Sequence, residues 1–315
     1  MYPADYPSPS ALHTSIGVQR HIANDFVVSA DFVYRHFVHL PGALDLNHFN
    51  STRGCVIPRC TGAQANDPRA ICSLGPINVQ RAWQRATYKG LLLRAEKRLS
   101  RGFQVLVSYA SSSNTGTSMS NGFNLDNWLQ NTGPLSTDFT HVANLAAAAP
   151  LPRRFELALN FSYSSTPPFT AFLGPNDFNG DGTTGDLLPG TTMNAFGRGM
   201  NRADLERLVA QFNASYAGTN DAQGRSIPRL ALPPHFSFGD DFQSLDFRLS
   251  RSFLFQERWR LTFIGEVFNL YNKSNLNGYN GDLTRPDFGQ PNSRATQVFG
   301  SGGPRAFQLA LRIGF

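Results

Sequence analysis

The end of the chain alternates between apolar and other residues with a period of two. Every second position is apolar, at Phe307, Leu309, Leu311, Ile313 and Phe315. Successive side chains of a β-strand point to opposite faces, so this pattern predicts a strand with one wholly apolar face. The same alternation recurs in segments 103–109, 155–163 and 245–249, and less regularly in 28–34, 91–95 and 259–267.

The alternating segments are longer than most strands of soluble sheets, which have about 5–6 residues. They match the ~9–11 residues with which a tilted strand crosses a bilayer. We predict about nine strands, over residues 11–22, 26–38, 79–99, 103–113, 139–149, 154–165, 244–255, 259–271 and 305–315.

The connections between these strands alternate in length. Short turns are predicted at 23–25, 100–102, 150–153 and 256–258, and long loops at 41–77, 114–137, 166–241 and 272–304. Outer-membrane barrels have this asymmetry, with short periplasmic turns and longer extracellular loops. A soluble sandwich such as a glycan-binding module is an alternative, but it would have shorter strands. The predicted fold is therefore an all-β, antiparallel transmembrane β-barrel.

Charged residues are scarce, at 16% of the chain, against about 25% in an average soluble protein. Each would cost ~2–4 kcal/mol near the bilayer midplane, so charges on strands are predicted to face the barrel interior. This predicted interior row comprises Arg94, Glu96, Arg98, Asp246, Arg248, Arg260 and Glu266. Aromatic residues near strand ends are predicted to mark the membrane interfaces, namely Tyr34, Trp83, Tyr88, Tyr109, Tyr163, Trp259 and Tyr271.

Several classes of function are not indicated. The formal net charge is +6, but the basic residues are dispersed, so no nucleic-acid partner is predicted. The chain contains no GxSxG, Walker or HExxH motif, so we predict neither an enzyme nor a cofactor, apart from the calcium candidate described below.

The beginning of the chain has no signal peptide, and the predicted strand count is odd. Bacterial single-chain barrels have an even number of strands. We therefore expect residues 1–315 to be one partial barrel domain that other segments precede in the intact protein. With open edges, this part is not expected to close into a barrel alone.

Three cysteines, Cys55, Cys60 and Cys72, lie in one predicted loop. We predict that two of them form a disulfide in an oxidising compartment and the third stays free, and the pairing is left open. A metal site is the alternative, although the loop has neither a CxxC pair nor a well-spaced histidine.

The longest predicted loop contains one helical pattern. Leu205, Leu208, Val209 and Phe212 repeat at helical spacing after Asn201. We expect this short helix to pack on the loop, with a partner-binding helix as the alternative.

The same loop contains a candidate calcium site. Asp177, Asn179 and Asp181, followed by Gly182, have the alternating oxygen ligands and the turn glycine of a calcium loop. Leu188 stands where an EF-hand has its bidentate glutamate, and Asp186 is a candidate substitute. The alternative is a plain loop, because Asn-Gly-Asp-Gly also favours turns.

Four stretches of the chain resemble known patterns. The terminal strand is similar to the C-terminal signal by which outer-membrane proteins are recognised for assembly, with Phe307, Leu309, Leu311, Ile313 and Phe315 as its apolar positions. Residues 266–272, EVFNLYN, resemble the penultimate strand of TonB-dependent receptors, particularly the Oar-like group with a carboxypeptidase-regulatory-like domain. Residues 96–104, EKRLSRGFQ, and 176–182, NDFNGDG, are similar to a hairpin and a loop of that group.

The resemblance implies a location in the outer membrane, in contact with its lipid, and recognition by the barrel assembly machinery. It implies active import of a large or scarce extracellular ligand, whose identity is unknown. The group's TonB box and plug domain are not in this sequence, so contact with the TonB complex is expected only through an N-terminal region. An adhesion or structural barrel without active transport is the alternative function.

Overall fold

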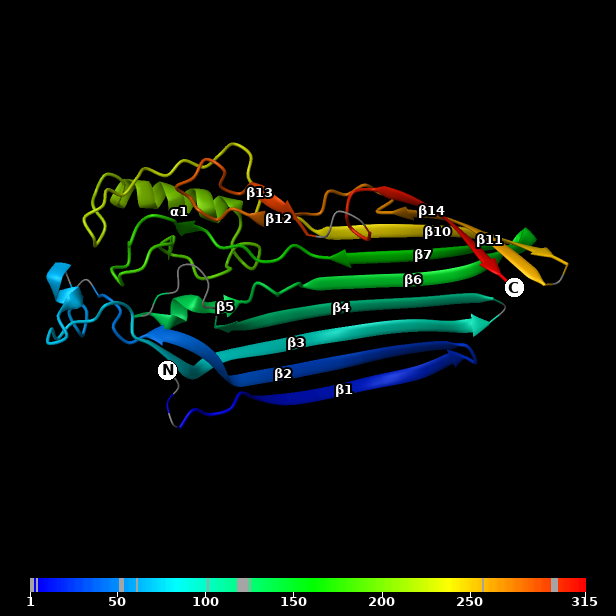
Figure 1. Ribbon diagram of the computed structural model, residues 1–315, viewed down its shortest axis with the longest axis horizontal. Helices are drawn as coiled ribbons and strands as arrows, with labels where there is room; N and C mark the ends of the chain where they lie inside the picture. The colour runs from blue at the N-terminus through cyan, green and yellow to red at the C-terminus, as the bar shows by residue number, and fades with distance from the viewer. Residues whose placement is uncertain are drawn as a thin grey trace.

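The computed structural model of the chain describes residues 3, 5–50, 54–60, 62–100, 102–117, 124, 126–256, 258–295 and 300–315. The main element of the structure is one long antiparallel sheet (Figure 1). Its strands, in spatial and chain order, are β1 (Ser10–Ala23), β2 (Phe26–Asp45), β3 (Asn78–Ser100), β4 (Phe103–Thr117), β6 (His141–Leu151), β7 (Phe155–Ser164), β10 (Phe242–Phe255), β11 (Trp259–Phe268) and β14 (Ala306–Gly314).

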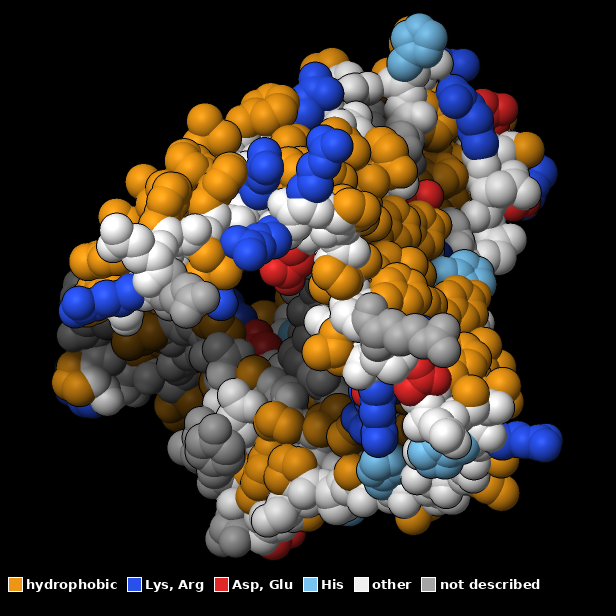
Figure 2. All heavy atoms as spheres, turned by 90° about the vertical axis from the view of Figure 1, so that its right-hand side faces the viewer, with side chains coloured by type: hydrophobic (Ala, Val, Ile, Leu, Met, Phe, Trp, Pro, Cys, Tyr) orange, Lys and Arg blue, Asp and Glu red, His pale blue; other side chains and the backbone are white. Residues whose placement is uncertain are grey.

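These nine strands of the described chain confirm the predicted all-β fold. The short strand β5 (Thr132–Pro134) extends the sheet beside β4. The sheet curls around a hollow, as the view along the strands shows (Figure 2). β1 and β14 form its two edges and do not pair with each other, so the barrel is not closed.

The pairing of β2 with β3 extends further than the alternation predicts. β2 was expected to end at residue 38 but continues to Asp45, paired with the beginning of β3. The register shifts between Phe37 and Pro41, where His39 has a positive φ of 58°. Such bulges insert an unpaired residue and reverse the side-chain pattern. The predicted loop 41–77 is therefore shorter, because β2 replaces its first five residues.

The two ends of the sheet differ as the connection lengths predict. β14 and the C-terminus point to the end with the short turns, which we term the turn end (Figure 1). The long connections gather at the opposite end, which we term the loop end. There, residues 166–241 and 272–295 pack together into one unit, which we term the loop module.

The loop module contains one helix, which the sequence predicts, and two short β-ladders, which it does not. The predicted helix is α1 (Arg202–Ser215), which Asn201 caps in a capping box with Asp204. Two small ladders, β8 (Phe172–Leu173) with β9 (Asp186–Leu187) and β12 (Leu276–Tyr279) with β13 (Pro291–Arg294), were not predicted. Three short 3-10 helices complete the described elements: η1 (Gly62–Asn66), η2 (Trp128–Asn131) and η3 (Pro152–Arg154).

The buried hydrophobic core lies in the loop module. Leu205, Leu208, Val209 and Phe212 of α1 are all buried, which confirms that the helix packs on the loop. They join a cluster that also contains Phe169, Ala171, Leu173, Leu188, Phe196, Ile227, Leu230, Leu283 and Phe288. The large aromatic residues of this core contact one another, as Phe169 and Phe288 do at a centroid distance of 5.7 Å.

The outer face of the sheet is apolar and exposed. Leu309 is 89% exposed and Phe315 is 90% exposed, and Phe307, Leu311 and Ile313 are also exposed. In water such a continuous surface would be unfavourable, because monomeric soluble proteins rarely expose large apolar patches. The helices among the described residues are not long and apolar enough to cross a membrane.

Candidate functional site

The other face of the sheet carries ion pairs. Arg94 Nη2 lies 2.8 Å from Glu96 Oε2 on β3, and Arg248 and Glu266 pair at 3.6 Å across the β10–β11 ladder. Opposite charges facing each other across strands stabilise the sheet modestly. These residues of the predicted interior row therefore share one face, opposite the exposed apolar side chains.

Tyr88, which was predicted to mark a membrane interface, lies on the polar face of the sheet. Tyr88 has the same parity as Arg94 and Glu96 in an uninterrupted ladder of β3 with β4, so it shares their polar face. It is therefore not part of a lipid-facing girdle. Tyr109 does face the apolar side at the loop end, where its hydroxyl lies 2.8 Å from His141 Nδ1.

A buried ion pair anchors the loop module to the sheet. Arg198 Nε donates to Asp138 Oδ2 at 2.6 Å, and the side chains are 15% and 4% exposed. Arg198 Nη2 also donates to the Thr166 carbonyl at 3.0 Å. The pair joins the module to the segment that leads into β6. Local sequence patterns do not indicate this pair, because 60 residues separate its members.

Two asparagines fix the connections between β10, β11 and β14. Asn269 has a positive φ of 48° and ends β11, which was predicted to continue to residue 271. Its side chain is fully buried and donates to the carbonyls of Lys273 and Gly303. Asn275 is 1% exposed and donates to the carbonyls of Gln243 and Gly302. Asn269 in the EVFNLYN segment and Asn275, three residues after that segment, thus tie together the loop-end connections of these strands.

The calcium candidate is a tight and buried turn. Asp177 accepts hydrogen bonds from the amides of Gly180 and Gly182, at 2.8 and 3.0 Å. Asp186 accepts from the amides of Phe178 and Asn179, and Asp181 from Thr183. The structure thus brings Asp177, Asp181 and Asp186 into one turn, and all three are almost completely buried.

The charge state of Asp186 reflects this crowding. Burial, together with the nearby carboxylates of Asp181 and Asp177, raises the pKa of Asp186 to about 6, although the amides of Asn179 and Phe178 act in the opposite direction. Within the described part of the chain, no group of three or more His, Cys, Asp or Glu side chains is arranged to hold a metal ion. Calcium binding at Asp177, Asn179, Asp181 and Asp186 stays a prediction.

The cysteine pairing that the sequence left open is resolved. Cys60 and Cys72 form a disulfide that closes the loop between β2 and β3. Cys55 is free and partly buried. The prediction of one loop disulfide and one free thiol is confirmed.

Comparison with known proteins agrees with this architecture. The model of one protein family, described as an outer membrane beta barrel domain, matches residues 1–308. The chain belongs to this family. The barrel domain therefore lies in the outer membrane, with its apolar face toward lipid and its short turns toward the periplasm.

Solved structures of outer-membrane proteins are similar in fold. The outer membrane transporter YddB from Escherichia coli is 14% identical, with a TM-score of 0.50, over 98% of this chain and 33% of YddB. The ferric-catecholate import receptor Fiu from E. coli is 10% identical, with a TM-score of 0.49, over 99% of this chain and 28% of Fiu. The ferric enterobactin receptor PfeA from Pseudomonas aeruginosa is 9% identical, with a TM-score of 0.47, over 97% and 31%.

The barrel domain spans about a third of the length of these solved chains. The likeness to YddB shows the fold alone. No curated protein sequence matches the chain.

Proposed function

We propose that the chain is the C-terminal barrel part of a TonB-dependent, Oar-like transporter, which imports a ligand too large or too scarce for porins. The observation that carries this proposal is the loop module, which has its own core and is held at the extracellular end by Arg198, Asn269 and Asn275. A rigid surface binds a ligand without the cost of ordering mobile loops. The EVFNLYN segment supports the Oar-like assignment.

The parts of the protein have separate roles in this proposal. The loop module selects the ligand, and the polar face with the Arg248–Glu266 pair lines the path or surrounds a plug. An N-terminal region contacts the TonB complex. The barrel assembly machinery recognises the terminal strand through Phe307, Leu309, Leu311, Ile313 and Phe315. The chain has no catalytic role in this scheme.

The effect of TonB on the uptake of compounds from the medium distinguishes active transport from adhesion. Mass spectrometry would measure the depletion of peptides and metal chelates from the culture medium by wild-type cells, by cells without this protein and by cells without TonB. We expect the same compounds to remain in the medium of both mutants. Equal depletion by all three strains, with weaker surface attachment of cells without the protein, would support the adhesion barrel instead.

A second measurement tests energy coupling directly. The full-length protein is mixed with the isolated periplasmic domain of TonB, and their association is followed by size-exclusion chromatography in detergent. A complex is expected, and its formation should require the region that precedes the barrel domain. Failure to form a complex would contradict TonB dependence but leave membrane placement untouched.

A further inference from the structure

Arg251 lies on the lipid-facing side of the barrel wall. Arg251 alternates with Ser250 and Ser252 on β10, so it shares a face with Leu249 and Phe253. On this face of β7, β10, β11 and β14, all of whose residues the structure describes, Arg251 is the one charged side chain. Isolated charges on a lipid-facing surface are unfavourable unless they reach a polar partner.

Two aromatic rings hold the guanidinium group of Arg251. Its Cζ lies 4.8 Å from the ring centroid of Phe155 and 4.6 Å from that of Phe253. Cation–π contacts of this kind fix the orientation of a guanidinium. The Nε atom is buried and has no hydrogen-bond partner, and none of the described residues forms an ion pair with Arg251. The two rings thus hold the guanidinium group in place, while its Nε–H has no hydrogen-bond acceptor among the described residues.

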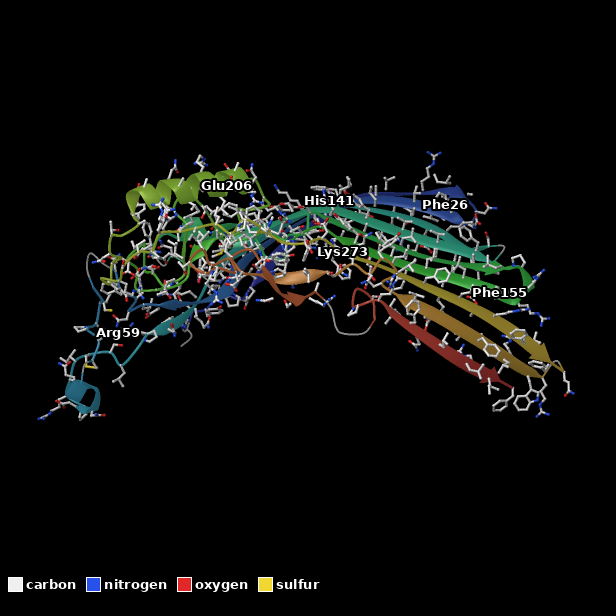
Figure 3. All side chains as sticks on the ribbon, turned by 90° about the horizontal axis from the view of Figure 1, so that it is seen from above. Phe26, Arg59, His141, Phe155, Glu206 and Lys273 are labelled. Carbon is white, nitrogen blue, oxygen red and sulfur yellow. A yellow bond between two sulfur atoms is a disulfide. The ribbon has the colours of Figure 1, made fainter. Side chains whose placement is uncertain are left out.

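Arg251 lies at the level of the periplasmic interface. It is four residues from Phe255, where β10 ends at the turn end. Phe155, which marks this level in Figure 3, begins β7 at the same end. The 3-10 helix η3, which contacts β10, adds the exposed Arg153 and Arg154. Figure 2, which looks onto this end, shows Lys and Arg side chains set among hydrophobic ones.

An apolar groove extends from Arg251 toward the middle of the membrane. Its volume is about 460 Å³, and its lipid-facing walls include Leu249, Phe263, Leu309 and Leu311. Gly265 lies between Leu249 and Leu309 in the ladder and contributes no side chain, which leaves the row hollow. The groove therefore begins beside a cation at the interface and continues where an acyl chain would lie.

We propose that this surface binds a phospholipid of the periplasmic leaflet. The guanidinium of Arg251 donates to the phosphodiester, which accepts the paired, charge-assisted hydrogen bonds that arginine favours. One acyl chain occupies the groove at Gly265. The polarity of the site matches the inner leaflet, because the cation is nearer the periplasm and the groove nearer the midplane. This site depends on the placement of the domain in the membrane and is independent of transport.

The full-length protein in mild detergent, titrated with phosphatidylglycerol and observed by native mass spectrometry, tests the proposal. The wild type should retain lipid, and Arg251→Gln should weaken that binding about tenfold, as expected for loss of a charge-assisted contact. Gly265→Leu, which fills the groove and keeps the cation, should also weaken binding. Arg251→Lys keeps the charge without the paired donors and should bind the lipid with an intermediate affinity. This variant tests the proposal even if Arg251→Gln does not fold.

Arg312→Gln is the matched control, because Arg312 is near the same end of β14 but on the polar face. It should bind phosphatidylglycerol like the wild type. Equal binding by Arg251→Gln and the wild type would overturn the proposal, as would an equal loss in Arg312→Gln. Millimolar inorganic phosphate should not displace the lipid, and displacement would identify an anion site that needs no acyl chain.

Discussion

The side-chain amide of Asn275 forms hydrogen bonds with both the backbone N–H and the backbone carbonyl of Gln243, as a neighbouring strand would. Asn275 Oδ1 accepts from the Gln243 amide at 2.8 Å, and Asn275 Nδ2 donates to the Gln243 carbonyl at 3.0 Å. The ladder of β10 with β11 stops at Phe247 and Val267. Asn275 therefore satisfies backbone groups of β10 beyond the point where β11 has ended.

Replacement of Asn275 by alanine should loosen the loop end. The change leaves the Gln243 backbone groups and the Gly302 carbonyl without this partner, and buried unpaired groups cost about 1–3 kcal/mol each. Hydrogen exchange of the Gln243 amide should accelerate accordingly, while the middle of β10 stays protected. Asn292→Ala is the control, because Asn292 is exposed. Unchanged exchange at Gln243 would show that the pairing contributes little.

Removal of Arg198 should release the loop module from the sheet. Arg198→Ala leaves Asp138 buried without its ion-pair partner, which typically costs about 3–5 kcal/mol. Limited proteolysis of the full-length protein should then cut residues 166–241 faster, while the barrel stays intact. The double variant Arg198→Met with Asp138→Leu should recover part of the resistance, because it leaves no unpaired charge. Equal proteolysis of all three proteins would contradict the anchoring role.

The turn that contains Asp186 should be more stable in mild acid. The pKa of Asp186 is raised to about 6 from 3.8, so its stabilising contribution is complete below about pH 4 and is lost as the pH rises through about 6. The change amounts to up to about 3 kcal/mol. Hydrogen-exchange protection of residues 177–186, corrected for intrinsic rates, should decrease between pH 5 and 7 in the wild type. Asp186→Asn should show no such decrease.

Calcium should reduce this pH dependence if the turn binds it. A cation among Asp177, Asp181 and Asp186 stabilises their ionised forms, so protonation is no longer needed to relieve the repulsion. The protection measured at pH 7 in millimolar calcium should approach that measured at pH 5. Identical protection with and without calcium would assign residues 177–186 to a plain structural turn.

Replacement of Phe315 by alanine should reduce assembly of the protein into the outer membrane. Phe315 ends the terminal strand, is 90% exposed and contacts Trp259 at a centroid distance of 5.5 Å. We expect a several-fold decrease in the heat-modifiable, membrane-inserted form on gels. Phe255→Ala removes an exposed phenylalanine near the same end but outside the terminal strand, and should insert normally. An equal decrease in both variants would indicate lost interfacial anchoring in place of a recognition signal.

Local patterns were sufficient to predict the wall of the barrel. Alternation is a property of neighbouring residues, so the strands around 155–163 and 307–315 and their apolar faces could be predicted directly. The capped helix α1 was predictable for the same reason, since its signals lie within one segment. The end of β2 was misplaced because the bulge at His39 interrupts the alternation that marks a strand.

The sequence by itself determined the nine strands of the barrel wall apart from the end of β2, the apolar side of the regularly alternating strands, and the confinement of one disulfide to one loop. Only the tertiary structure decided that Cys60 pairs with Cys72, that Arg198 reaches Asp138, and that Arg251 lies between Phe155 and Phe253. The physical reason is distance along the chain. Periodicity reports on the backbone within one segment, whereas these contacts join segments whose meeting depends on the packing of the whole domain.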